Sequence, residues 1–278
     1  MIRSRLSRQS NFFDNLSSIF RTHPRSSSLK PILIAKMSTV ESAKQKAGET
    51  AVNDWLKDGQ VVGIGSGSTI TYAVKAIARR VQNEKLRIKC VPTSFQAKEL
   101  ILENDLELTS LDKHYQIDVA FDGADEVCRD FTIIKGGGGC LLQEKIVASC
   151  SRDFIVLIDE SKCSETLGSH WTRGLPIEVI PMACKPVQSW IENSLGGKAV
   201  LRPAITKMGP QLTDNGNFIL DWQFDPKLKH DWPKIGLEIL KLPGVVETGL
   251  FINMARRIYI GHLDGSLKTW DNSHPTGI

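Results

Sequence analysis

The stretch QVVGIGSGSTITYAVKAIARRVQNE, residues 60–84, decides the fold class of this chain. Residues 60–65 are a short β-rich run, which predicts a strand, and residues 69–84 carry apolar side chains at helical spacing. The glycine-rich turn GIGSGST joins the two segments. A strand that passes through glycines directly into a helix is typical of α/β proteins with a parallel sheet.

The same alternation continues along the chain. Further strands are predicted at 86–92, 117–125, 131–135 and 153–161, and further helices at 94–105 and 140–150. Ser94 is expected to cap the first of these helices. Near-continuous apolar strands separated by helices indicate a Rossmann-like parallel sheet that is covered on both faces.

A smaller α+β region is predicted over residues 174–252. Its strands are expected at 175–180, 198–205, 216–224 and 245–252, and its helices at 184–197 and 232–244. The order βαββαβ is that of a ferredoxin-like unit. Residues 253–278 contain a DG turn and are expected to return to the first region as an edge hairpin. The predicted domains are therefore 38–173 plus 253–278, and 174–252.

The first 37 residues form a basic segment that is set apart from the rest. Residues 1–36 carry seven basic side chains against the single acid Asp14, a net charge of +6. Few acids with many serines and arginines are typical of a mitochondrial presequence, and a disordered extension before a second start at Met37 fits equally well. Both interpretations stay open, and residues 1–37 are left out of the predicted fold.

The remaining composition excludes several classes of protein. Because the whole chain carries +4 and the basic segment +6, the rest carries −2, which gives no case for a nucleic-acid partner. No apolar run reaches the length of a membrane span, so no membrane partner is expected. The six cysteines form no CxxC pair and the six histidines no ligand spacing, which predicts reduced thiols and no metal site.

The loop GIGSGST, residues 63–69, is a candidate anion site, because free backbone N–H groups converge where a glycine-rich turn enters a helix. It lacks the lysine of a P-loop and the full glycine pattern of a dinucleotide fingerprint. The hydroxyls of Ser66, Ser68 and Thr69, beside Gly67, suit a single phosphate. A plain tight turn explains this loop equally well when it is taken alone.

Acidic side chains follow the strand that ends in AFDGADEV, residues 120–127. Asp122 and Asp125 emerge at its carboxyl end, where open α/β sheets bind their ligands, and Gly123 lets the chain turn between them. A helix cap beside a solvated acid explains most isolated matches of this kind. The pair is a candidate site only in combination with other loops.

The stretch FTIIKGGGGCLLQEKIVAS, residues 131–149, has the same strand–loop–helix layout. Lys135 ends the strand, Gly136–Gly139 turn the chain, and Glu144 falls near the first helical turn, where the macrodipole favours a carboxylate. A solvated helix face explains Glu144 alone. Four glycines are costly to order, and a substrate lying against their backbone would explain them.

A fourth loop, IDESK at 158–162, puts Lys162 just past another strand end. All four loops are expected to open on the same edge of one sheet and to enclose a pocket with phosphate donors, two carboxylates, two lysines and a glutamate on a helix. No cofactor motif accompanies them. The joint pattern therefore favours chemistry on a small phosphorylated substrate.

The motifs GIGSGST, DGADEV, KGGGGCLLQEKIVA, DESK and LPIEVIP occur in an order and spacing that resemble ribose-5-phosphate isomerase, type A. TDNGNFILDW and PGVVETGLF continue the resemblance, which covers about residues 40–270 and is similar to the animal members. It implies interconversion of D-ribose 5-phosphate and D-ribulose 5-phosphate in the pentose phosphate pathway, without a metal or nucleotide cofactor.

The resemblance also implies roles for individual residues. Glu144 would be the base that moves a proton between C2 and C1 through an enediolate, Asp122 and Lys135 would handle the substrate oxygens, and Asp125 would orient them. Implied substrate contacts are Ser66, Gly67, Ser68, Thr69, Asp122, Gly123, Ala124, Asp125, Lys135, Gly136, Gly137, Gly138 and Lys162. Lys46 is a looser candidate for the phosphate.

Some features stay open at this point. Cys128 stands where an Asp or Asn is usual in the family, and its role is open. The alternatives to an isomerase are a sugar-phosphate sensor without turnover and acyl-CoA transfer by a nucleophilic glutamate. A homo-oligomer, most simply a dimer, is expected in the cytoplasm, or in mitochondria if the basic segment is a targeting signal.

Overall fold

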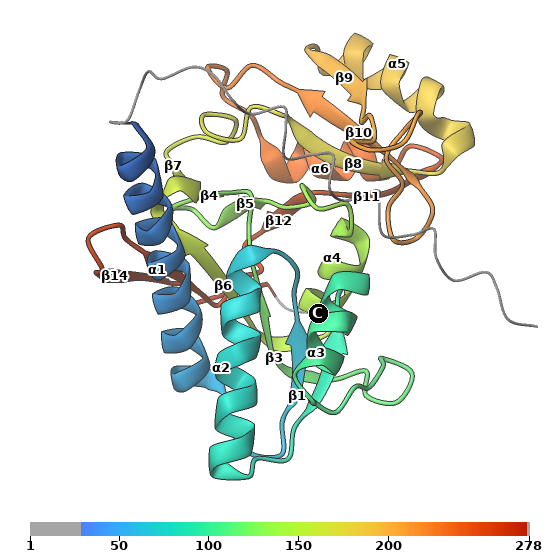
Figure 1. Cartoon of the computed structure of the whole chain (residues 1–278). Coiled ribbons are helices and arrows are strands. Elements are labelled where there is room, and N and C mark those ends of the chain that lie inside the picture. The colour runs from blue at the N-terminus through green and yellow to red at the C-terminus, as the bar shows by residue number, and fades with distance from the viewer. Residues whose placement is uncertain (1–28, 277–278) are drawn as a thin grey trace, which may run out of the picture. The chain divides into compact units, whose positions relative to one another are not determined.

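A computed structural model describes residues 29–276 and places side chains from Thr39 onward (Figure 1). The basic segment predicted over residues 1–37 lies outside the described residues as far as residue 28. Its last part belongs to a helix that the sequence analysis did not predict, α1 (Leu29–Trp55). Thr39–Ile278 form one compact unit, and the predicted division of that unit into two domains stays a prediction.

The predicted parallel sheet is confirmed. It has the strand order β14-β13-β6-β3-β1-β2. The strands are β1 (Val61–Ile64), β2 (Lys89–Pro92), β3 (Ile117–Asp122), β6 (Ser151–Asp159), β13 (Arg257–Gly261) and β14 (Leu267–Asp271). All neighbours pair in parallel except β14, which pairs antiparallel with β13. The predicted C-terminal hairpin therefore joins this sheet, with β13 inside it and β14 at its edge.

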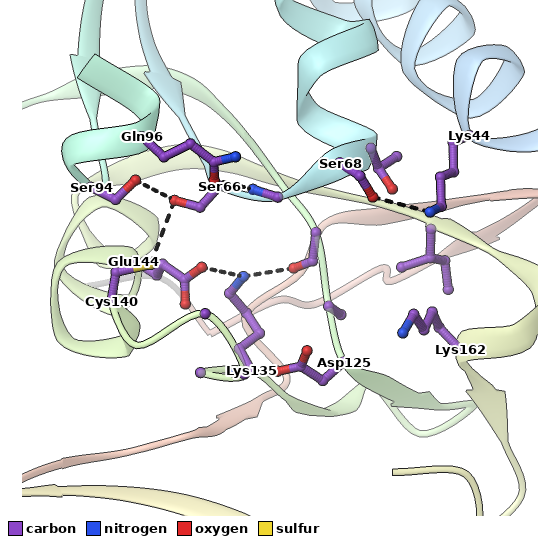
Figure 2. A pocket seen from close by; sticks show the side chains of 18 of the residues that line it. Lys44, Ser66, Ser68, Ser94, Gln96, Asp125, Lys135, Cys140, Glu144 and Lys162 are labelled. Carbon is purple, nitrogen blue, oxygen red and sulfur yellow. Dashed lines mark hydrogen bonds and ion pairs between the residues drawn. The ribbon is translucent and has the colours of Figure 1, made fainter. Parts of the chain in front are cut away.

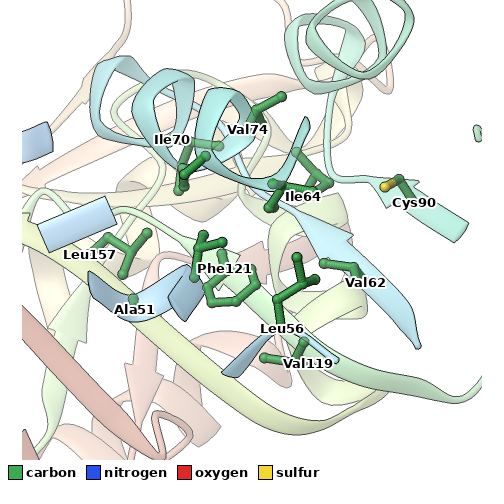
Figure 3. Close-up of a cluster of buried hydrophobic side chains, with 14 of the residues drawn as sticks. Ala51, Leu56, Val62, Ile64, Ile70, Val74, Cys90, Val119, Phe121 and Leu157 are labelled. Atoms are coloured by element: carbon green, nitrogen blue, oxygen red, sulfur yellow. The ribbon is translucent and has the colours of Figure 1, made fainter. Parts of the chain in front are cut away.

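Helices cover both faces of this sheet because their apolar sides match the apolar strands. On one face, α1 and α2 (Ser68–Glu84) pack on β1, β3 and β6, where Val62, Phe121 and Leu157 are buried (Figure 3). On the other face, α4 (Leu141–Ser149) contributes Val147 to a second buried cluster. The helix α3 (Phe95–Glu103) begins at Ser94, whose side chain accepts the Ala97 N–H, as the sequence predicts.

The smaller region also has the predicted fold. Its sheet has the order β11-β8-β10-β9 and is antiparallel throughout, which is the arrangement of a ferredoxin-like unit. The elements are β8 (Leu175–Val179), α5 (Cys184–Ser194), β9 (Lys198–Leu201), β10 (Phe218–Gln223), α6 (Trp232–Leu240) and β11 (Val245–Thr248). Apolar side chains of both helices, including Ile191 and Ile239, pack on this sheet.

A third sheet was not predicted. It has the order β12-β5-β4-β7 and consists of β4 (Glu126–Cys128), β5 (Thr132–Ile134), β7 (Cys163–Ser164) and β12 (Leu250–Ile252). The strand predicted at 131–135 lies here, antiparallel to β4, and not in the parallel sheet. The expectation that all four loops leave one sheet is therefore wrong. The local pattern shows an extended strand but not its pairing partner.

The strand predicted at 245–252 is in fact two strands that belong to different sheets. The break falls at Gly249, whose N–H donates to Pro176 O and whose carbonyl accepts the Lys135 N–H. A Cβ on Gly249 would lie 2.2 Å from Lys135 O, so only glycine fits between these two backbones. The hydrogen bond from the Lys135 N–H to Gly249 O also fixes the backbone of Lys135.

Two short 3₁₀ helices complete the described chain, η1 (Glu160–Lys162) and η2 (Pro181–Ala183). Among the described residues, no helix combines the length and the apolar character that crossing a bilayer requires.

Candidate active site

A cavity of about 280 Å³ lies beyond the carboxyl ends of β1, β3 and β6, with the glycine loop before α4 as a further wall (Figure 2). Every predicted site residue except Asp122 lines it. Three of the four predicted loops leave the parallel sheet, and the fourth reaches the same cavity from β5 in the third sheet. The four predicted loops thus meet at one cavity, although the strand before one of them lies in a different sheet from the predicted one.

A buried cluster of three charges lies at the base of this cavity. The Lys135 ammonium is 3.0 Å from Asp122 Oδ2 and 3.3 Å from Glu144 Oε1, and it also donates to Gly123 O at 2.6 Å. No side chain of the three is more than 7% exposed. One ammonium thus faces two carboxylates in a site that water barely reaches.

Glu144 has the properties of a proton acceptor. Its Oε1 accepts from Lys135, while its buried Oε2 has no hydrogen-bond partner among the described residues. Burial raises the pKa of Glu144 to about 7, against the opposing effect of the Lys135 ammonium. A carboxylate with a free oxygen and a pKa near neutrality is suited to general acid–base catalysis.

Lys135 is held in its charged form. Burial by itself would lower the pKa of this ammonium, but the charges of Asp122 and Glu144 outweigh burial and raise the pKa above its ordinary value. The side chain therefore supplies a fixed positive charge and hydrogen-bond donors. Such a group stabilises negative charge that develops on an oxygen nearby.

Asp122 lies behind Lys135 and holds it in place. Its Oδ1 accepts the N–H groups of Ser66 and Gly123 at 3.0 and 2.7 Å. A Cβ on Gly65 would lie 2.1 Å from the same oxygen, so the first glycine loop makes room for this carboxylate. Because Asp122 is not among the residues that line the cavity, we interpret it as the counter-charge of Lys135 and not as a substrate contact.

Asp125 lies on the cavity wall and is fixed by the glycine loop. Its Oδ2 accepts the Gly137 N–H at 2.6 Å. Burial raises the pKa of Asp125, while this hydrogen bond and the charges of Lys135, Lys162 and Arg202 oppose the rise. The carboxylate thus has a hydrogen-bond donor and cations around it on the cavity wall.

The glycine loop requires glycine mainly for structural reasons, which corrects the interpretation that a substrate alone explains it. Gly136 and Gly139 have φ values of 104° and 89°, which disfavour other residues. A Cβ on Gly137 would lie 2.5 Å from Asp125 Oδ1 and 2.7 Å from Trp171. Only Gly138 has both room for a Cβ, with the nearest atom, Cys140 Sγ, at 3.9 Å, and a φ outside the left-handed region.

The first glycine loop leads from the charged cluster, where the Ser66 N–H donates to Asp122, to the N-terminus of α2 at the other end of the cavity (Figure 2). Ser66 Oγ lies 2.6 Å from Ser94 Oγ, and the Gly67 N–H donates to Gln96 Oε1 at 2.9 Å. Ser68 Oγ accepts from the Lys44 ammonium at 3.0 Å. Hydroxyls, a helix N-terminus and a lysine together make an anion site.

Six further polar or thiol-bearing lining residues were not assigned to the site; Cys140 and Asp159 adjoin predicted loops, and the other four are remote from them in sequence. Lys44, Ser94, Gln96, Cys140, Asp159 and Asp214 all line the cavity. Lys44 takes the place that the sequence analysis offered to Lys46, which is exposed and does not line it. Lys44 lies one turn before Gly48, the glycine of α1 that approaches Ala73 on α2, and the sequence does not show this approach.

Lys145 also contributes, by fixing the helix that carries Glu144. Its ammonium lies 2.8 Å from Glu247 Oε1 and donates to Thr248 O at 2.7 Å, so it ties α4 to β11. It also lies 4.9 Å from the centre of the Phe251 ring.

Cys128, which the sequence analysis left open, is buried in the third sheet and does not line the cavity. Burial raises its thiol pKa to about 12, so it stays protonated and unreactive. The thiol on the cavity wall is Cys140, whose pKa burial also raises. Within residues 29–276, no three His, Cys, Asp or Glu side chains are placed to hold a metal ion.

Known proteins share both this sequence and this fold. The family model of ribose 5-phosphate isomerase A (phosphoriboisomerase A) matches residues 89–265. Ribose-5-phosphate isomerases of pig and human are each 55% identical over 232 residues, which is 84% of this chain and 75% and 74% of theirs.

A solved structure agrees with these relatives. A D-ribose-5-phosphate isomerase in complex with phospho-erythronic acid is 38% identical, with a TM-score of 0.79 over 84% of this chain and 99% of the other. The resemblance that the motifs indicate is confirmed. The chain belongs to the ribose 5-phosphate isomerase A family.

Proposed function

We propose that this chain interconverts D-ribose 5-phosphate and D-ribulose 5-phosphate, as an aldose–ketose isomerase of the pentose phosphate pathway. The observation that carries the proposal is Glu144 Oε2, which has no hydrogen-bond partner within residues 29–276 and lies beside the Lys135 ammonium, at the wall of a cavity whose other end suits an anion. A proton acceptor, an oxyanion partner and a phosphate site are the three parts that this reaction requires.

Glu144 is the base in this proposal. In the open-chain aldose, its carboxylate removes the proton on C2, and the electron pair moves through the new C1–C2 double bond onto the aldehyde oxygen. The enediolate then receives the same proton on C1, and the C2 hydroxyl loses its proton to the C1 oxygen as the ketone forms. No oxidant or reductant enters, because the two carbons exchange oxidation states.

Lys135 stabilises the negative charge of the enediolate oxygens, since its ammonium lies 3.3 Å from the base and is itself almost wholly buried. Asp122 keeps Lys135 charged and in position, and Lys135, which lines the cavity, assists ring opening. Asp125, fixed by Gly137, accepts from sugar hydroxyls and orients the chain of the substrate.

The phosphate is bound at the other end of the cavity in this proposal. The residues there are Gly67, Ser68 and Thr69, at the positive end of α2, and Lys44, which contacts Ser68. Ser66 joins this loop to the charged cluster through Asp122. Lys162, half-buried on the cavity wall, contacts the sugar. The phosphate and the sugar thus contact different groups, which determines the orientation in which the substrate binds.

The relatives support this proposal over its alternatives. Proteins named ribose-5-phosphate isomerase match most of the chain, and one of them binds phospho-erythronic acid, a phosphorylated acid whose carboxylate is a planar oxyanion. A sensor without turnover is not favoured, because the charged trio Asp122, Lys135 and Glu144 is complete. Acyl-CoA transfer by a glutamate has no support from the relatives.

The direct test is to incubate the protein with ribose 5-phosphate in deuterium oxide and follow the mixture by NMR. We expect ribulose 5-phosphate to appear. Deuterium should enter C1 or C2 to the extent that the proton held by Glu144 exchanges with the solvent before it returns to carbon. A sensor would bind the sugar without forming ketose, and an acyl-CoA transferase would form a thioester that mass spectrometry detects.

The rate is expected to depend on pH through Glu144. Because its folded-state pKa is about 7, kcat/KM should rise with pH to a plateau above 7 and lie about tenfold below it at pH 6. The same raised pKa makes the contribution of Glu144 to the free energy of unfolding fall as pH rises from about 4.5 to about 7. Initial rates and urea unfolding across this range measure both effects; a rate independent of pH from 5 to 8 would contradict the assignment.

Alanine at Gly137 and at Gly138 should have different effects. At Gly137 the new Cβ displaces Asp125, so we expect kcat/KM to fall and the free energy of unfolding to fall by about 1–3 kcal/mol. At Gly138 the space is open, so the variant should fold as stably as the wild type and show a raised KM. Steady-state kinetics and urea unfolding of the two variants test this; equal stabilities would argue against the contact at Gly137.

We also propose that the chain acts as a homo-oligomer, most simply a dimer, in the cytoplasm. The homo-oligomer is supported by the family, whose members are usually dimers or tetramers. The cytoplasmic location is supported by the reduced thiols expected from the sequence. Sedimentation of the purified protein tests the oligomer. Fluorescent fusions that start at Met1 and at Met37 test whether the basic segment directs the protein to mitochondria.

A further inference from the structure

Arg202 is a buried arginine outside the charged trio of the site. It directly follows β9, in the ferredoxin-like region, and is 2% exposed. Its Nε and Nη2 donate to the two carboxylate oxygens of Asp221 on β10, at 2.8 and 2.5 Å. This two-point pairing uses one edge of the guanidinium and fixes its plane.

The other edge of the guanidinium binds the glycine loop of the active site. Arg202 Nη1 donates to Gly136 O at 2.8 Å and to Gly137 O at 3.2 Å. One side chain therefore connects the ferredoxin-like sheet to two successive peptide groups on the cavity wall. Both carbonyls point toward Arg202 and away from the cavity.

The orientation of these carbonyls determines where the next N–H groups point. In a trans peptide, the carbonyl of one residue and the N–H of the following residue point in opposite directions. Because the Gly136 carbonyl accepts a hydrogen bond from Arg202, the Gly137 N–H faces Asp125 and donates to it at 2.6 Å. Because the Gly137 carbonyl also accepts a hydrogen bond from Arg202, the Gly138 N–H points to the same side as Asp125, toward the cavity.

The Gly138 N–H is available for a ligand. Gly138 lines the cavity, and within residues 29–276 its N–H has no hydrogen-bond partner. We propose that Arg202 is a positioning residue for the isomerase reaction, which holds Gly136 and Gly137 so that the Gly138 N–H donates to a substrate oxygen and the Gly137 N–H orients Asp125. This inference rests on the proposed function.

The charge of Arg202 acts in the same direction as its hydrogen bonds. Burial raises the pKa of Asp125, and the guanidinium is one of the positive charges that oppose this rise. Removing Arg202 therefore loosens the loop and makes Asp125 easier to protonate. Both changes weaken the sugar end of the cavity and leave the phosphate end, at α2, untouched.

The test uses three variants of the full chain. Arg202→Lys keeps a positive charge but cannot contact Asp221 and both carbonyls at once. Arg202→Met combined with Asp221→Leu removes both charges, so neither is left buried alone and folding is preserved. Arg257→Lys is the matched control, because Arg257 pairs with Asp271 away from the cavity.

We measure kcat and KM for ribose 5-phosphate, and the affinities for phospho-erythronic acid and for inorganic phosphate. For Arg202→Lys and the double variant, kcat/KM and the affinity for phospho-erythronic acid should fall by about 10- to 100-fold, as expected when donors to an oxyanion are displaced. The affinity for inorganic phosphate should stay the same, and Arg257→Lys should resemble the wild type. A merely structural role would weaken both ligands together.

Two outcomes would overturn the inference. One is an Arg202→Lys variant with unchanged kcat/KM and unchanged affinity for phospho-erythronic acid. The other is an equal loss of affinity for phospho-erythronic acid and inorganic phosphate. Failure of the proposed function would look different: the wild type would form no ribulose 5-phosphate, whereas the two affinities would still report whether Arg202 orients the sugar end.

Discussion

The Glu144→Gln variant is expected to lose roughly 10³- to 10⁴-fold in kcat, the upper range of what a general base contributes. Glutamine has the shape of glutamate, but its amide cannot take the C2 proton. The affinity for phospho-erythronic acid should change far less, because Lys135, Asp125 and the phosphate loop are untouched. Rates of ketose formation and calorimetric titration with that acid measure the two quantities.

The control is Glu99→Gln, on the exposed side of α3, which should have wild-type kinetics. The solvent-exchange experiment adds a second criterion, since Glu144→Gln should also stop deuterium from entering C1 and C2. If Glu144→Gln keeps more than a tenth of the wild-type kcat, another group is the base.

Lys135→Met is expected to damage both the reaction and the fold. In the described chain, Lys135 is the only cation within ion-pair distance of Asp122 and Glu144, so its loss leaves two buried carboxylates without a counter-charge. We expect the free energy of unfolding to fall by about 3–5 kcal/mol at pH 8, as when one partner of a buried pair is removed. We also expect kcat to fall by roughly 10²- to 10³-fold through loss of oxyanion stabilisation.

A second substitution separates the two effects of Lys135→Met. Adding Asp122→Asn removes one of the stranded charges, so the double variant should recover stability while its kcat stays low. Lys113→Met, at an exposed position, is the matched control for loss of a lysine. Urea unfolding and initial rates at pH 8 measure both quantities, and recovery of the rate along with the stability would remove Lys135 from the chemistry.

Much of the fold and of the site could be predicted because it is encoded in local pattern. The strand, glycine loop and helix of residues 60–84 specify a parallel sheet, and the carboxyl ends of its strands then place Ser66, Asp125 and Lys162 together. Ser94 could be predicted as a helix cap because its hydroxyl acts on a backbone N–H three residues away. Interactions of this range are visible in sequence.

The features that could not be predicted depend on partners far away in the chain. The pairing of β5 with β4 and β12 depends on backbone contacts that periodicity does not record. The break at Gly249 exists because the backbone of Lys135 passes next to it. Lys44 and Asp214 line the cavity from opposite ends of the sequence, and their spacing carries no signal of this.

The position of β13 has a consequence while the chain is being synthesised. β13 covers the edge of β6 inside the parallel sheet, yet it is synthesised after the whole ferredoxin-like region. Until the ribosome releases Arg257–Gly261, β6 presents a free edge of apolar residues, and such edges bind other chains. We therefore expect chains that stop before β13 to aggregate, even though all the cavity-lining residues are already present in them.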